Sequence, residues 1–487
     1  MTWIINKEVC IVGTGFCGYA AYKKLKEKNL SLIVVEGGEV KTPSSKNEQK
    51  NYKTSVNKYF SNFSKKKIRN LLEISFRDRQ FTLGGSSEGW AGYIKPFEES
   101  TFSNIFKDFE NQTWGKIRFD KYNEEILNLL NSPSLDFKPE SIAKKINSEL
   151  PILPIGLKYT TYAWAASPKR LKSFWIKQLK KAKDDQNDVI TGFKLIDFNF
   201  KQDRLNGLIF KNKDGQLLIV EAKFFMFCMG GIENAKFTKK LLESNNRIPL
   251  KNTNLCNFQE HPHLYFLAGF NKGEKLLPKI IRSRTVVSPS VHKSFKNGQL
   301  NISFQAWDGI GTPKATIMIE ENKEKFSNLI KNIIKPFFNK VTRPYYDYLL
   351  VMRCEQTPNK NSFLKFDQNL TKLDWNLDNK DFSYYSDYLR RMASFLIINN
   401  YAKDFSLKDE AIQGKAIPSS VDGGAHHMGT VPYTLNNDLI NEKFRLTQYD
   451  NTYVVGSSAF PTSGFENPTH AAMATALVAS DDIIQRT

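Results

Sequence analysis

EVCIVGTGFCGYAAYKKL, residues 8–25, runs from a short apolar strand through a glycine-rich turn into an amphipathic helix. A second apolar strand, LIVVE, follows at residues 32–36, so this stretch predicts one β-strand–helix–β-strand unit. Three glycines in the turn have the spacing G-x-G-x-x-G: Gly13, Gly15 and Gly18. Glycines there permit a tight turn and let the backbone approach a pyrophosphate at the N-terminus of the helix. The chain is therefore expected to begin with a dinucleotide-binding unit.

Glu36 strengthens this interpretation because it ends the second strand, where a carboxylate can accept hydrogen bonds from the ribose hydroxyls of a bound adenosine. The fingerprint lies near the N-terminus and is not repeated, which favours FAD over a nicotinamide cofactor. The alternative, that the glycines only permit close helix–strand packing, stays open on this stretch alone.

Composition describes a large globular protein with an excess of positive charge. At 487 residues and 40% hydrophobic content, the chain should form two to four domains with substantial cores. Its formal charge of +20 comes from 70 Lys and Arg against 50 Asp and Glu, and the longest basic run is only Lys65–Lys67. Diffuse charge of this kind favours a solvated surface over a dedicated anion-binding field.

Cysteine usage and hydropathy suggest where the protein works. The five cysteines are odd in number and lack metal-type spacing, which favours free thiols in a reducing compartment. The N-terminus has no pattern of an ordinary signal peptide, and no stretch holds eighteen uninterrupted apolar residues. We expect a cytoplasmic protein without a transmembrane segment.

Further along, apolar segments predict strands at Leu195–Phe200, Leu205–Ile209 and within LNISFQAW, residues 300–307. Helical periodicity appears around Ile330–Phe338 and Tyr384–Asn399. The segment LGGSSEGWAGYIKPF, residues 83–97, combines glycines and aromatics and is expected to be an ordered functional loop.

The C-terminal region carries the most specific pattern: GAHHMGTVPY at residues 424–433, then NTYVVGSSAFPTSGFENPTHAAMATALVASDDI at residues 451–483. Together with the N-terminal fingerprint and the loop at 83–97, this pattern resembles the glucose-methanol-choline (GMC) oxidoreductases. FCMGGIENAKFTKKLL with CNFQEHPH, and CEQTPNKNSFLKF with LDWNL, are similar to further family segments in the same order. The sugar-oxidising branches are the most similar.

The resemblance implies roles for particular residues. His426, in the family's His-x-x-Gly-Thr motif, would be the base that takes the hydroxyl proton as hydride leaves for flavin N5. Asn467 would hold the substrate oxygen and stabilise developing alkoxide charge. The residues expected to contact FAD are Gly13, Gly15, Gly18, Glu36, Gly84, Gly85, Ser86, Ser87, Gly456, Ser457, Pro468 and Thr469.

Several residues are left with alternative roles. His427 and His470 are neighbours that could replace His426 as the base in a different register. His261 and His263 flank a proline and are interpreted as structural or cofactor-contacting; we expect no metal, because no third ligand is apparent. Some sugar-oxidising relatives bind FAD covalently through a His in the Gly-Gly loop, whereas this chain has Ser87-Glu88-Gly89-Trp90, so covalent attachment is not expected. Val431-Pro432-Tyr433 departs from the family's usual Thr-Arg-Met and would reshape the rim of the pocket.

The resemblance implies a mixed α/β fold with two domains. The Rossmann-like FAD-binding domain would be assembled from residues 1–105, 190–263 and 420–487, and a substrate domain with a mainly antiparallel sheet from residues 106–189 and 264–419. The expected partner is a small alcohol or sugar, for which the positive charge would suit an anionic derivative, and not nucleic acid. Two other functions stay open: a non-redox FAD-containing lyase, and a basic binding protein that retains FAD structurally. The electron acceptor and oligomeric state are left open.

Overall fold

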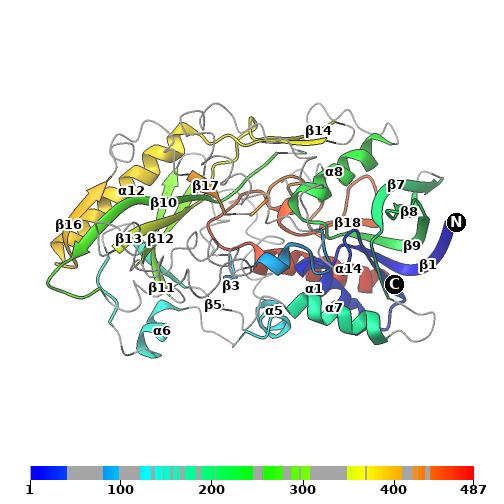
Figure 1. Cartoon of the computed structure of the whole chain (residues 1–487), viewed down its shortest axis with the longest axis horizontal. Coiled ribbons are helices and arrows are strands. Elements are labelled where there is room, and N and C mark those ends of the chain that lie inside the picture. The colour runs from blue at the N-terminus through cyan, green and yellow to red at the C-terminus, as the bar shows by residue number, and fades with distance from the viewer. Residues whose placement is uncertain are drawn as a thin grey trace, which may run out of the picture.

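Two separate β-sheets organise the chain. The computed structural model describes residues 2–40, 81–90, 92–97, 121–132, 138–181 with short gaps at 146, 148, 154–156, 162 and 165–169, 188–244 without 203, 255–277 without 256, 287–307 without 296–297, 348–407 without 368–369, and 421–487 without 425 and 434–438. The basic run Lys65–Lys67 and the helix expected around residues 330–338 lie outside these ranges. Figure 1 shows the two sheets at opposite ends of the long axis, with both chain termini beside the first sheet.

The first sheet contains the predicted dinucleotide-binding unit. Its strands are β1 (Thr2–Val12), β2 (Leu32–Glu36), β6 (Val189–Thr191), β7 (Lys194–Lys201), β8 (Arg204–Lys211), β9 (Leu217–Phe227) and β18 (Thr452–Val454), in the order β6-β2-β1-β9-β8-β7 with β18 beside β9. The pairs among β6, β2, β1, β9 and β18 are parallel, whereas β7, β8 and β9 form antiparallel hairpins. The predicted unit and the two predicted strands between residues 195 and 209 are confirmed.

Helices bury the central strands of this sheet. The strand β2 is buried along its whole length, as apolar parallel strands are when both faces are covered. The covering helices are α1 (Phe16–Lys26), α5 (Asn123–Leu129), α7 (Arg170–Lys181), α8 (Gly230–Glu243) and α14 (Thr469–Arg486). In Figure 1, α8 lies on one side of the sheet and α1, α7 and α14 lie on the other. The helices α5 and α7 come from the predicted substrate segment 106–189, yet their apolar side chains join this core.

The second sheet is antiparallel throughout its described pairs. It contains β4 (Leu157–Thr161), β10 (Pro262–Lys272), β11 (Val287–Phe295), β12 (Gly298–Trp307), β13 (Tyr348–Cys354), β16 (Ala402–Leu407) and β17 (Val421–Gly423), in the order β16-β10-β13-β12-β11-β4 with β17 beside β10. The long helix α12 (Asn379–Ile398) packs on this sheet through buried residues such as Tyr385 and Met392. A mixed α/β fold with an antiparallel second sheet is therefore confirmed.

The remaining described elements are short. They are the 3₁₀ helices η3 (Gly85–Gly89) and η6 (Ser457–Ala459), the helix α6 (Pro139–Lys145), the hairpin β14 (Phe363–Asp367) with β15 (Leu370–Asp374), and the short pair β3 (Tyr93–Ile94) with β5 (Ala163–Trp164). The segment before β10 passes from the first sheet toward the second, and Gln259 pairs there with Met428. The sequence motifs at both positions therefore meet between the two sheets.

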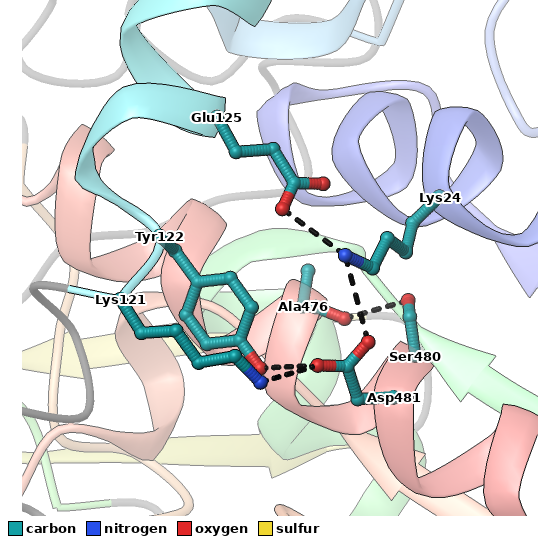
Figure 2. A network of polar contacts seen from close by, with 7 residues as sticks. All are labelled: Lys24, Lys121, Tyr122, Glu125, Ala476, Ser480 and Asp481. Atoms are coloured by element: carbon teal, nitrogen blue, oxygen red, sulfur yellow. Dashed lines mark hydrogen bonds and ion pairs between the residues drawn. The ribbon is translucent and has the colours of Figure 1, made fainter.

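A polar cluster joins three helices from distant parts of the chain. Asp481 on α14 accepts a hydrogen bond of 2.6 Å from the hydroxyl of Tyr122 and lies 3.6 Å from the ammonium of Lys24 on α1. Lys24 also contacts Glu125 on α5 at 3.1 Å, and Figure 2 shows these side chains converging between the helices. The cluster fixes the mutual positions of α1, α5 and α14.

Two sequence expectations can be checked on the described residues. Cys10, Cys17, Cys228 and Cys354 are free thiols, whereas the fifth cysteine, Cys256, lies outside the described residues. In the described part of the chain, no helix combines the length and the apolar character needed to cross a membrane.

Candidate active site

The glycine turn has the geometry that its sequence predicts. Gly13 has φ +102°, and a Cβ there would lie 2.6 Å from the carbonyl oxygen of Cys228. A Cβ on Gly18 would lie 2.0 Å from the carbonyl oxygen of Gly13. Gly15 differs, because a Cβ built on it meets no atom within 4 Å. Two of the glycines are thus required for packing, and the third borders open space at the N-terminus of α1.

That open space suits an anion. The first turn of α1 contains no acidic residue, and no side chain caps its N-terminus. The free main-chain N–H groups of such a turn carry partial positive charge and bind phosphate groups. The residues present therefore fit the pyrophosphate of a dinucleotide.

Glu36 lies at the end of β2 beside the same turn. Its carboxylate accepts hydrogen bonds from the main chain of Thr14 at 3.0 Å, from the Thr14 hydroxyl at 2.6 Å and from the main chain of Gly38 at 2.8 Å. Burial raises the pKa of Glu36, while these donors act to lower it. A carboxylate has about four acceptor sites, and the main chain of Gly37 also acts on Glu36, so a ribose hydroxyl would share or replace one of these donors.

The Gly-Gly-Ser-Ser loop lies against this turn. Gly84 donates its main-chain N–H to the hydroxyl of Thr14 at 2.8 Å, and a Cβ on Gly85 would lie 3.8 Å from the Cα of Gly15. Both glycines have positive φ, +92° and +55°. Ser87 is buried and its hydroxyl donates to the carbonyl of Gly84, whereas Ser86 is exposed. The loop therefore lies against the nucleotide turn.

The C-terminal residues expected at the cofactor reach the same region. Gly456 has φ +100°, and a Cβ there would lie 3.1 Å from the Sγ of Cys17 on α1. Ser457 begins η6, and its hydroxyl donates to the carbonyl of His427 at 2.7 Å. Pro468 and Thr469 are buried at the start of α14, which no side chain caps. Three segments far apart in sequence therefore meet around the N-terminus of α1.

The histidine-bearing segment 426–433 is held by backbone hydrogen bonds on two sides. Gln259 and Met428 exchange main-chain hydrogen bonds of 3.0 Å, and Gly429 donates to the carbonyl of Ser457 at 3.1 Å. The hydroxyl of Thr430 donates to the carbonyl of Gly231. This hydroxyl is thus bonded within the protein. The segment is fixed between the nucleotide sheet and the start of β10.

His426 is the centre of a group of three imidazoles. Its Nδ1 lies 2.7 Å from Nδ1 of His261, and its ring centroid lies 6.2 Å from that of His263. A Cβ on Gly424 would lie 2.8 Å from Nε2 of His263 and 3.0 Å from Nδ1 of His426, so only glycine leaves room for both rings. The side chain of Glu260 accepts from the main-chain N–H groups of His426 at 2.7 Å and His261 at 2.9 Å.

The structure places a third histidine, His426, beside His261 and His263, which sequence spacing alone did not predict. One ring nitrogen from each of His261, His263 and His426 lies within 4.8 Å of the others, close enough to consider a metal ion. Two observations disfavour a cation there. The 2.7 Å contact joins two of the would-be ligand atoms in a hydrogen bond, and the positive charge of Arg353 acts on all three rings.

Burial and charge keep these imidazoles neutral. Burial, with help from Arg353, lowers the pKa of His261 to about 4. Burial followed by the influence of His261, His263 and Arg353 holds the pKa of His426 well below its usual range. Burial likewise holds the pKa of His263 well below its usual range. An uncharged imidazole can accept a proton, which is the first requirement for a base.

Asn467 lies on a loop that is anchored to the same group. Its side chain is only 7% exposed, and its Oδ1 has no hydrogen-bond partner. Buried amide oxygens normally have one, so this atom is available to a bound molecule. The loop is held by Glu355, which accepts from the Thr462 hydroxyl at 2.5 Å and from the Gly464 main chain at 3.2 Å.

The competing histidines occupy different surroundings. His427 turns toward Glu260, with 4.0 Å between its Nε2 and the carboxylate, and its ring lies 5.7 Å from that of Phe258. His470 is fully buried within the first turn of α14. Trp90 contacts the ring of Phe16 at 4.7 Å, and Tyr93 lies under the guanidinium of Arg353 at 5.1 Å.

Three participants were missed by sequence reasoning: Glu260, Arg353 and Ser463. Glu260 precedes His261 in the Gln-Glu-His-Pro-His turn, a signal that sequence could have offered. Arg353 lies opposite His263 on the neighbouring strand β13, and Ser463 accepts from His261 through its carbonyl. The role of Arg353 depends on strand register, and that of Ser463 depends on its main-chain carbonyl. Neither feature can be predicted from a side-chain motif.

Comparisons with known proteins agree with this arrangement. Residues 363–476 match the model of the family described as GMC oxidoreductase. No curated protein matches the chain. Pyridoxine 4-oxidase from Mesorbium loti is 14% identical, with 99% of each chain covered and a TM-score of 0.59. A mutant of formate oxidase from Aspergillus oryzae RIB40, solved to study the effect of the mutation on FAD modification, is 14% identical, with 100% of this chain and 99% of that chain covered and a TM-score of 0.61. These solved structures share the fold of the chain along its full length.

Proposed function

We propose that this FAD-dependent GMC oxidoreductase oxidises the CH–OH group of a small alcohol, with His426 as the base and Asn467 as the partner of the substrate oxygen. The observation that carries the proposal is the environment of His426. Its imidazole is neutral, and Glu260 and His261 hold it in place by hydrogen bonds. Its segment is also hydrogen-bonded to Ser457, an expected contact of the cofactor.

The chemistry divides between the cofactor and the side chains. When bound, FAD supplies the hydride acceptor. His426 takes the hydroxyl proton of the alcohol as its C–H bond breaks, so the products are a carbonyl compound, a protonated imidazole and a reduced acceptor. Asn467 would donate its amide N–H to the substrate oxygen while negative charge develops there. A positioned base of this kind contributes about a hundredfold to ten-thousandfold in rate.

Anaerobic stopped-flow absorbance tests this proposal. Purified yellow protein is mixed with sugars, phosphosugars and simple alcohols, and with pyridoxine and formate because two structural neighbours are oxidases with those names. Bleaching of the flavin band in the wild type, slowed about a hundredfold or more in His426→Ala, is expected. The matched control is His427→Ala, which should bleach nearly as fast as the wild type.

Three results would contradict the proposal. A colourless protein that takes up no FAD removes the central premise. A yellow protein that no alcohol bleaches favours the lyase reaction over alcohol oxidation. Equal loss in the two histidine variants, or loss only in His427→Ala, transfers the role of base away from His426.

For the substrate class, we propose a sugar or sugar derivative that carries an anionic group. The proposal of an anionic group is supported by Arg353, because its positive charge lowers the pKa of all three imidazoles and so acts within this site. The formal charge of +20 would also draw an anion toward the protein. The bleaching rate at low concentrations of a phosphosugar should then fall steeply with salt, while that of the uncharged sugar should not. Equal insensitivity of both would contradict electrostatic recruitment.

We also propose a cytoplasmic location, which the four free thiols support. Localisation of a tagged chain by microscopy, with fractionation of the cells, tests this directly. Recovery of the protein outside the cytoplasm with paired cysteines would contradict it.

A further inference from the structure

Two groups form a chain of contacts that leads to the candidate base: the carbonyl of Ser463 contacts His261, and His261 contacts His426. The Nε2 atom of His261 lies 2.9 Å from the carbonyl oxygen of Ser463, and its Nδ1 lies 2.7 Å from Nδ1 of His426. The His261 ring is 1% exposed, and the two imidazoles meet edge to face with 83° between their planes. Both nitrogens of His261 are therefore committed to fixed neighbours.

The carbonyl of Ser463 decides where the protons lie. A carbonyl oxygen only accepts, so Nε2 of His261 must carry the hydrogen of the 2.9 Å bond. A neutral imidazole has one N–H, which leaves Nδ1 of His261 as an acceptor. The hydrogen in the 2.7 Å contact must then belong to Nδ1 of His426. A neutral His426 with hydrogen on Nδ1 has a bare lone pair on Nε2.

We propose that His261, oriented by the carbonyl of Ser463, is a positioning residue that locks His426 in the tautomer with an unprotonated Nε2, the atom that takes the substrate proton. The inference rests on the proposed function of His426 as the base. It adds a new role for a residue that sequence reasoning placed only as structural or cofactor-contacting. Without the lock, a neutral imidazole divides between its two tautomers, and one of them cannot accept at Nε2.

The surroundings favour this arrangement over a charged or metal-bound one. Burial lowers the pKa of His261 to about 4, so the ring is neutral at physiological pH and keeps its acceptor at Nδ1. Glu260 bonds the main-chain N–H groups of both histidines, which holds the two rings at hydrogen-bonding distance. A metal between the Nδ1 atoms would have to replace the hydrogen of their short contact.

The tautomers of the unaltered protein give the first test. The purified protein is labelled with ¹⁵N in its histidine rings, and long-range proton–nitrogen spectra are recorded at neutral pH without substrate. Signals of His426 and His261 are assigned by their loss in His426→Asn and His261→Asn. The expected result is hydrogen on Nδ1 of His426 and on Nε2 of His261. Hydrogen on Nε2 of His426 would overturn the proposal.

A matched pair of variants gives the second test. His261→Asn places an amide oxygen near the position of Nδ1 and can still accept from His426. His261→Gln places its amide near the position of Nε2, so it can bond Ser463 but leaves His426 without its acceptor. At equal FAD content, the bleaching rate constant at saturating substrate should fall about threefold to tenfold in His261→Gln, in proportion to the competent tautomer that is lost, and less than about twofold in His261→Asn. Ring spectra of His261→Gln should show a mixture of tautomers at His426.

The outcomes separate this inference from the function on which it rests. If His426→Ala bleaches as fast as the wild type, the proposed function fails, whatever the ring spectra show. If His426→Ala is slow but both His261 variants slow the reaction equally with the tautomer of His426 unchanged, His261 is only a packing residue and the lock is overturned. Poor folding of His261→Gln leaves the first test intact, because that test uses only the wild type and the two Asn variants that assign its signals.

Discussion

Gly424 has no side chain, and this permits His263 and His426 to lie beside each other. A Cβ at this position would meet both rings, at 2.8 Å and 3.0 Å. Gly424→Ala should therefore displace the rings and slow flavin bleaching about a hundredfold, since small misplacements of catalytic groups carry costs of that size. Thermal unfolding and FAD content should remain close to the wild type. Unchanged bleaching would show that the rings can separate without cost.

Protonation of the same imidazoles predicts the pH dependence of the reaction. Burial and the neighbouring histidines and Arg353 hold the pKa of His426 well below its usual range, although the Glu260 carboxylate lies close to its main chain. The base form should persist as pH falls past the ordinary histidine value of about 6.5, and bleaching should slow only below it. In Arg353→Gln the acid limb should move to higher pH. A wild-type limb at or above the ordinary value would contradict this.

Stability should follow pH in the same direction. A histidine whose pKa is lowered on folding takes up its proton in the unfolded chain first, so the unfolded state binds more protons between the two pKa values. For His261 that window runs from the ordinary value of about 6.5 down to about 4. The contribution of His261 to the free energy of unfolding should be fully present above this window and should be lost as pH decreases through it. Urea unfolding at several pH values, with His261→Asn as the control, measures this contribution.

At the scale of elements, two glycines at the start of α1 have different roles: Gly18 is needed for packing, and Gly15 is expected to border the cofactor. Gly18→Ala would put a Cβ 2.0 Å from a backbone oxygen, so we expect severe loss of folded protein. Gly15→Ala meets nothing within 4 Å, and its φ of −66° suits any residue, so the apoprotein should unfold at the wild-type temperature. Its methyl group would occupy the space beside the expected pyrophosphate, and FAD affinity should fall at least tenfold by titration. Full FAD affinity in Gly15→Ala would place the pyrophosphate elsewhere.

The sequence predicted elements better than it predicted the connections between them. Local pattern was sufficient for β1, α1, β2 and the antiparallel strands, because each alternation or glycine turn is contained within a few residues. His426 became a candidate through the resemblance of residues 426–430 to a family motif. The partners of His426 were not visible, because His261 is 165 positions away and the carbonyl of Ser463 belongs to no side-chain motif. The assignment of α7 to the first core was missed for the same reason, since Trp175 bonds the main chain of Thr14 161 positions away.

At the scale of the whole molecule, Asp481 ties together helices from the two ends and the interior of the chain. Although burial opposes it, the hydrogen bond from Tyr122 and the charge of Lys24 lower the pKa of Asp481. Asp481→Asn should therefore cost about 1 to 3 kcal/mol of unfolding free energy at neutral pH. The loss should shrink as acid protonates the wild-type carboxyl through its lowered pKa. Tyr122→Phe, which keeps the contact of Asp481 with Lys24, should lose less, and an equal loss would assign the stabilisation to the tyrosine alone.

The strand order of the first sheet also determines when its strands can pair during translation. β1 pairs with β9, and β9 pairs with β18, so the nucleotide sheet closes only when the end of the chain is made. At roughly 5–20 residues per second, β1 waits roughly 10 to 40 s on the ribosome for β9, and β18 follows after a further interval of similar length. During that time the apolar edge of β1 has no permanent partner. Capture of the expected cofactor should therefore wait until β18 has been synthesised, and nascent chains should depend on chaperones until then.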